Sequence, residues 1–185
     1  MASAYANMWV GSVSAYRLGV YRWSLFLTAF VAFAVGAPYM CHQFGIAGMV
    51  FLPMHFAVIL AAMTMGIGGG VAAALLSPFI SFILSGMPPA HMLVPMTLEL
   101  CVYAAVAGWL VQHKRMPLVA ALVIAMIAGR VFAIGLSFAM LGSAFSLMNR
   151  AKALFVLGVP GMIIQLAFLP PAVSKIGRYL SDPNH

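Results

Sequence analysis

The chain has 185 residues, of which 65% are hydrophobic and only 6% are charged, and its mean hydropathy is +1.10. The surface of a soluble domain this size needs far more charge, so the composition excludes one and indicates an integral membrane protein. The net charge of +7 comes from basic residues spread along the chain, which is typical of membrane topology rather than of nucleic-acid binding. We expect a single all-α membrane domain over 1–185, because an unpaired strand edge is not tolerated in lipid.

The N-terminal segment 1–18 is only moderately apolar and predicts an interfacial segment rather than a span. Arg17 and Arg22 precede an apolar stretch that could be mistaken for a cleavable signal peptide. Pro38 directly follows the only small-residue cleavage pattern and would block cleavage, so we predict a retained first helix over 22–37.

Small residues recur at every fourth position of this first helix, at Thr28, Ala32 and Gly36. Such spacing lets helix backbones approach closely, either within the bundle or at a docking surface for another membrane subunit. The sequence leaves both readings open.

Five further apolar segments follow, separated by short breakers, and together with the first helix they predict a bundle of six helices. These segments are 48–66, 67–84, 92–111, 117–141 and 154–176.

Basic residues set the expected orientation of this bundle. With a cytoplasmic N-terminus, most of them face the cytoplasm, so the positive-inside rule predicts that both termini are cytoplasmic. The inner set is Arg17, Arg22, Lys114, Arg115, Lys175 and Arg178, and the outer set is Arg150 and Lys152.

Three polar side chains interrupt three successive apolar helices. Glu99 lies in the run VPMTLELCVYAAVAGWLV, about 10 Å below the outer end of its helix at 1.5 Å per residue. Arg130 and Gln165 lie roughly 16 Å deep in the next two helices. Charged groups at such depth face the bundle interior or water and pair with one another or with a ligand.

Two interpretations of this constellation remain open. Glu99 and Arg130 either form a salt bridge that fixes one helix to the next, or they contact a small ligand. The planar fork of an arginine suits a carboxylate, a phosphate or a pyrimidine-like edge, and a glutamate accepts from an amine or a ring N–H.

Further candidates surround this pair. Tyr103 and Met96 lie on the same helix face as Glu99 and would suit a flat heteroaromatic ligand, although plain packing is the alternative. His55 and His91 would line the mouth of such a pocket, or would simply be satisfied or solvated histidines.

The sequence predicts no resident metal, no cofactor and no enzymatic activity. Cys41, His42 and the many methionines raise the possibility of a soft metal, but their spacing fits no metal-binding motif. Nucleotide-binding loops and nucleophile motifs are absent from the sequence, and its two carboxylates leave few candidates for acid–base chemistry. Any ATPase would have to be another chain.

The stretches LPMHFAVILAAMTMGIGGGVAAALLSPFISFILSGMPPAHMLVPMTLELCVYAAVAGWL and GVPGMIIQLAFLPPAVSKI carry a likeness to a known family. Over residues 20–178 the chain resembles the substrate-binding S components of energy-coupling factor (ECF) transporters. The resemblance depends on the order of a Pro-led second helix, a Gly-rich turn, a Ser-Gly-Met-Pro-Pro loop, a Glu in helix four and a Pro…Gln…Pro helix six.

The resemblance implies a high-affinity capture protein for a vitamin or cofactor precursor in the bacterial cytoplasmic (inner) membrane. Such a protein delivers its ligand through a membrane coupling subunit and two cytoplasmic ATPases. By position, the resemblance implies ligand contacts for Glu99, Tyr103, Arg130, Asn149 and Gln165. The docking motif of the family is Ala-x-x-x-Ala in helix one, for which Thr28, Ala32 and Gly36 are the looser match.

Two rivals remain. A solitary transporter would work without ATPases, and a structural or assembly membrane protein would have no ligand and would lock Glu99 and Arg130 together.

Overall fold

The computed structural model describes residues 20–44, 52–141 and 147–181, and the regular structure in these residues is entirely helical. The helices are α2 (Val20–Gln43), α4 (Pro53–Ser85), α5 (Ala90–Gln112), α6 (Leu118–Leu141) and α7 (Leu147–Ser181). Each of these five helices is long and apolar enough to cross a membrane. The prediction of an all-α membrane fold is confirmed for these ranges, and the predicted interfacial segment 1–18 lies outside them.

Helix α4 contains the segment predicted as 67–84 and residues 53–66 of the segment predicted as 48–66, and a non-helical residue at Gly66 divides it at the predicted boundary. In the described residues α4 is one of five candidate spans, and it consists of two helical arms that meet at Gly66. Gly66 interrupts α4 with φ 88° and ψ −176°, a conformation that glycine alone adopts readily. A Cβ atom at this position would also collide with the side chain of Gln112, at the end of α5.

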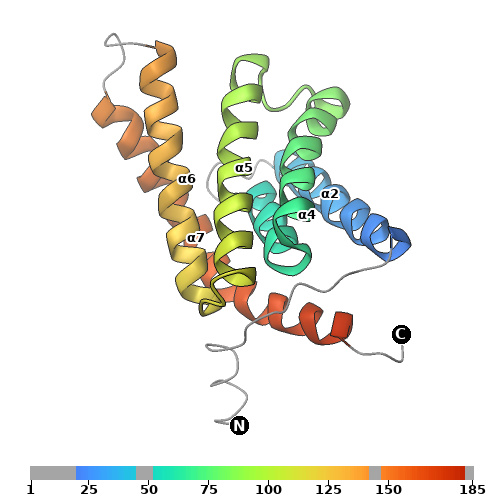
Figure 1. Cartoon of the computed structure of the whole chain (residues 1–185). Helices are drawn as coiled ribbons and strands as arrows, with labels where there is room; N and C mark the ends of the chain where they lie inside the picture. Colours follow the sequence, from blue (N-terminus) through green and yellow to red (C-terminus); the bar gives the residue numbers. More distant parts are fainter. Residues whose placement is uncertain (1–19, 45–51, 142–146, 182–185) are drawn as a thin grey trace.

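The break at Gly66 reverses the direction of the chain. A Cβ atom on Gly70 would lie 2.6 Å from the Cα atom of Ala62, although residues this far apart in a straight helix are separated by about 12 Å. The two arms of α4, 53–65 and 67–85, therefore fold back on each other, as Figure 1 shows.

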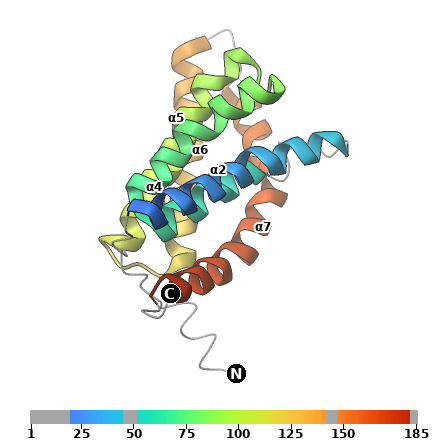
Figure 2. The same ribbon diagram turned by 90° about the vertical axis from the view of Figure 1, so that its right-hand side faces the viewer.

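The helices alternate in direction along the bundle. In Figure 1 the second arm of α4 runs up to the α4–α5 turn, α5 runs down, α6 runs up and α7 runs down again. The α5–α6 turn and the end of α7 thus lie at the lower end of this view, and the α4–α5 turn lies at the upper end. Figure 2 shows that α7 bends along its length, which is expected for a helix containing Pro160, Pro170 and Pro171.

The core and the outer surface are both apolar. Ala57, Val58 and Ile59 in the first arm of α4 are completely buried. Large apolar side chains such as Val131 and Phe168 are instead exposed on the outside of the bundle. In water such a surface would drive aggregation, whereas in a bilayer it is the normal lipid-facing surface.

Candidate functional site

A buried polar cluster joins α4, α5 and α6 in the middle of the bundle. Arg130 Nη1 donates a hydrogen bond of 3.2 Å to Glu99 Oε1, which joins α6 to α5. His55, in the first arm of α4, places its Nε2 atom 3.8 Å from the same carboxylate oxygen. All three residues are nine-tenths buried or more, with exposed fractions of 8% for Glu99, 3% for Arg130 and 6% for His55. The structure therefore brings together Glu99 and Arg130, and adds His55, which was expected at the mouth of the pocket.

Tyr103 closes one side of this cluster. It lies one turn after Glu99 on α5 and is 2% exposed. Its ring packs edge to face against the ring of His55, with the centroids 5.3 Å apart and the planes at 82°. On α6, Gly129 leaves the room for this ring, since a Cβ atom there would lie 2.6 Å from a Tyr103 ring carbon. Of these two adjacent residues of α6, Gly129 leaves space for the ring of Tyr103, and Arg130 donates a hydrogen bond to Glu99.

The cluster contains more hydrogen-bond donors than its own acceptors use. Arg130 Nε and Nη2 have no hydrogen-bond partner among the described residues, and neither does His55 Nε2, for which 3.8 Å is beyond hydrogen-bonding distance. The great majority of buried donors in proteins have a hydrogen-bond partner, and those that have none call for a physical explanation. A bound polar molecule is one such explanation.

Gln165 is fully buried on α7, but the hydrogen bond it makes is outside the ion pair. Its Nε2 atom donates to the backbone carbonyl oxygen of Leu52 at 3.5 Å, directly before α4 begins. Leu52 has the left-handed φ of 50°, and its carbonyl oxygen also accepts from the backbone N–H of Phe56. Gln165 therefore ties α7 to the start of the helical arm that carries His55.

The remaining predicted site residues are distributed differently. Met96 is half-buried and packs against the hydrophobic core, and His91 is exposed in the first turn of α5. The side chain of Asn149 lies outside the part of the chain whose side chains the structure describes.

Sequence reasoning missed Gly158 of α7, which lies directly beside the arginine. A Cβ atom on Gly158 would be 2.8 Å from Arg130 Nη2 and 3.5 Å from a side-chain methyl of Leu52. The missing side chain therefore lets the backbone of α7 pass close to Nη2 of the guanidinium. A glycine among the apolar residues of a transmembrane helix was the only available signal, and glycine is too common in such helices to be informative alone.

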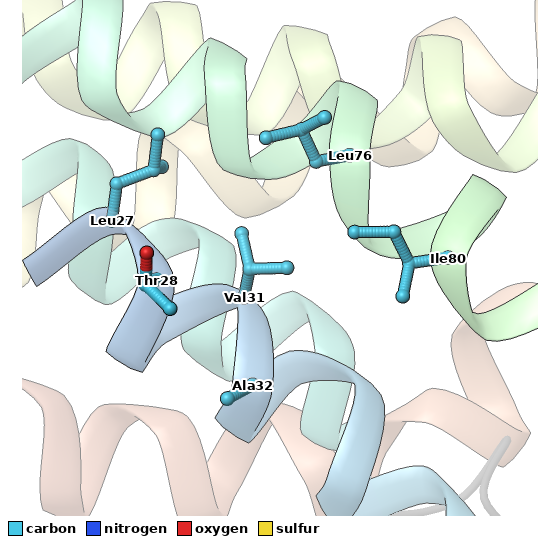
Figure 3. A pocket seen from close by; sticks show the side chains of 6 residues that line it. All are labelled: Leu27, Thr28, Val31, Ala32, Leu76 and Ile80. Atoms are coloured by element: carbon cyan, nitrogen blue, oxygen red, sulfur yellow. The ribbon is translucent and has the colours of Figure 1, made fainter. Parts of the chain in front are cut away.

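The residues expected to dock a partner lie on the outer side of α2. Thr28 and Ala32 are exposed and Gly36 is half-buried. Thr28 and Ala32 line a shallow apolar groove of about 270 Å³ together with Leu27, Val31, Leu76 and Ile80. Figure 3 shows that the last two side chains come from the second arm of α4, across the groove from α2.

Comparison with known proteins gives one match. The sequence model of the family described as "ECF transporter, substrate-specific component" matches residues 29–177, which is most of the chain. This range contains all of α4, α5 and α6, and therefore the whole polar cluster. No curated protein and no solved structure matches the chain.

Proposed function

The chain belongs to the substrate-specific components of ECF transporters, and we propose that it captures a small micronutrient at the cluster of His55, Glu99 and Arg130. Membership of this family and the five apolar helices make it a multi-pass membrane protein that serves substrate uptake. In this proposal the protein performs no chemistry. It binds its ligand on the outside of the bacterial inner membrane and delivers it inward.

The observation that carries the proposal is the unused hydrogen-bonding capacity of the cluster. In a purely structural ion pair, good geometry and further hydrogen bonds must offset the cost of removing both charges from water. Here Nε and Nη2 of Arg130 are buried without a partner among the described residues. Leaving a buried donor unpaired costs about 1–3 kcal/mol, and more for a charged group, so a ligand that accepts from these atoms gains that energy on binding.

In the proposed orientation, a ligand that approaches from outside the membrane can reach the cluster. Lys114 and Arg115 belong to the α5–α6 turn, and Lys175 and Arg178 to the last turns of α7, which lie at the same end of the bundle. Basic residues concentrate on the cytoplasmic side, so we assign this end to the cytoplasm. Glu99 then lies about 14 Å from the outer end of α5, at 1.5 Å per residue, and its helix continues inward well beyond it.

In this orientation the two arms of α4 are separate passes. The second arm, 67–85, is about 28 Å long at 1.5 Å per residue, which is close to the thickness of the hydrocarbon core. Counted as two passes, the arms give an even number of passes, as two cytoplasmic termini require, and the described part of the first arm, 53–65, supplies about 20 Å of its pass.

Delivery requires partners that this chain does not supply. We propose that Thr28, Ala32 and Gly36 face a membrane coupling subunit, which in turn works with two cytoplasmic ATPases. The support for this surface is that it presents small residues on the outside of α2 beside an apolar groove, where another helix can approach closely.

The test is native mass spectrometry of the protein purified in a mild detergent from cells grown in rich medium. We expect a small molecule bound in a one-to-one ratio, which is released on denaturation and identified by its mass. The matched control is the Arg130→Gln variant, which should be purified without this molecule. A protein that carries no small molecule, and whose thermal unfolding does not change across a panel of vitamins, would refute capture and favour the structural rival.

A further inference from the structure

The two free donors of Arg130 lie on one edge of the guanidinium group. The hydrogen bond to Glu99 uses Nη1, so the atoms without a partner in the described residues are Nε and Nη2. In the planar guanidinium, the N–H of Nε and one N–H of Nη2 point in the same direction. This pair is the fork that binds two acceptor oxygens side by side.

The surroundings of this edge exclude bulk water. Arg130 is 3% exposed, so bulk water does not solvate the fork. On the side of Nη2 stands Gly158, at a position where the Cβ atom of any other residue would lie 2.8 Å from the nitrogen. Meanwhile the bond to Glu99 holds the opposite side of the guanidinium and fixes the direction in which the fork points.

Charge distinguishes between the anions that match such a fork. Arg130 and Glu99 together carry no net charge, so a monoanionic carboxylate would bring the buried group to −1 and a dianionic phosphate would bring it to −2. Burying uncompensated charge is costly, and the cost rises with its magnitude. The monocarboxylate therefore fits this site better than a phosphate ester does.

From these observations we infer that the captured molecule carries a carboxylate, whose two oxygens accept from Nε and Nη2 of Arg130 beside Gly158. This inference depends on the proposed capture function and specifies the class of its substrate. Glu99 is then a positioning residue, which holds the guanidinium, and the rest of the molecule lies towards His55 and Tyr103.

The first experiment determines the chemical class of the molecule that co-purifies with the protein. After release, it is treated with methylamine and a carbodiimide, which convert a carboxyl group to a methylamide, and is weighed before and after. We expect the mass to rise by that of methylamine less one water for each carboxyl group, the water being taken up by the carbodiimide as a urea, and fragmentation of the product to show an amide rather than the phosphoramidate that a phosphate would form. A molecule without a reactive carboxyl group would overturn this inference and leave the capture function intact, whereas a protein without any bound molecule would overturn both.

The second experiment tests the fork itself. Arg130→Lys keeps the positive charge but has no planar pair of donors, so retention of the molecule should fall by about tenfold or more. Arg115→Lys is the matched control, because Arg115 is exposed in the α5–α6 turn, and it should retain the molecule as well as the unmodified protein does. Full retention by Arg130→Lys would overturn the inference.

Gly158→Ala supplies a variant that does not depend on removing a charge. The new Cβ atom would lie 2.8 Å from Nη2, closer than such atoms pack, so the guanidinium must shift and the fork must change its direction; we expect retention to fall by about tenfold in protein that still folds. Unchanged retention in this folded variant would contradict the assigned binding edge.

Discussion

The ion pair between Glu99 and Arg130 can be tested by a double-mutant cycle that separates its structural role from its role in binding. Glu99→Gln leaves the guanidinium of Arg130 buried without a carboxylate, and Arg130→Met leaves the carboxylate of Glu99 buried without a cation. Both groups are at most 8% exposed and their atoms are 3.2 Å apart, so each single variant should lose about 3–5 kcal/mol of stability. The double variant leaves neither charge unpaired and should recover about 3 kcal/mol of the summed loss.

The measurement is the midpoint of thermal unfolding in one fixed detergent. A loss of this size should lower the midpoint of each single variant by roughly 6–20 °C for a chain of this length. Retention of the co-purifying molecule is measured on the same samples. All three variants should retain less than a tenth of it, because each removes or misplaces the hydrogen bonds from Arg130 to the molecule. Additive losses in the double variant would refute the ion pair as a coupled unit, and full retention would refute its part in binding.

Three further predictions concern the parts of the fold that position the site and the partner. Gly66→Ala should lower the thermal midpoint, because the backbone conformation at this position costs a residue with a side chain about 1–3 kcal/mol. Gly68→Ala, where a Cβ atom meets nothing within 4 Å, should leave the midpoint unchanged or raise it. Equal midpoints for the two variants would contradict strain at the break. Gln165→Leu should cost about 1 kcal/mol, seen in the same assay, because it removes the amide that donates to the backbone before α4, and an unchanged midpoint would show that this hydrogen bond contributes nothing. Ala32→Phe should abolish co-purification with a coupling subunit while retention of the small molecule and the thermal midpoint stay unchanged, and a complex that survives this change would rule out docking on this face of α2.

Much of the fold follows from the sequence, because a bilayer restricts the solutions. Helices were predicted from apolar runs, and the described ranges confirm helices in those runs. The boundary predicted between residues 66 and 67 falls at the break in α4, where the two arms meet. Hydropathy alone could not show that a single glycine makes this reversal, because the apolar run continues through it.

The candidate site was only partly predictable. The depths of Glu99 and Arg130 in neighbouring helices indicated that they could meet, and the structure pairs them. The sequence could not predict that His55 would join them, because its place depends on how the first arm of α4 packs against α5. Gln165 was at the expected depth, yet its partner is a backbone carbonyl, which no pattern of side chains indicates.

Small residues explain how the first arm of α4, which carries His55, comes to lie beside Glu99. Inside a membrane, helices gain little from hiding apolar surface from one another, so association depends on close packing and on polar contacts. A Cβ atom on Gly108 of α5 would lie 2.9 Å from the backbone nitrogen of Ile67, and one on Gly70 of α4 would lie 3.1 Å from the Cβ atom of Ala104. These glycines hold the second arm of α4 against α5 next to the break, and Gly70 also brings the first arm close, since its Cβ atom would lie 2.6 Å from the Cα atom of Ala62. The position of His55 opposite Glu99 is therefore a consequence of the tight α4–α5 contact, and a substitution that separates these two helices should weaken ligand capture even though it touches no polar residue.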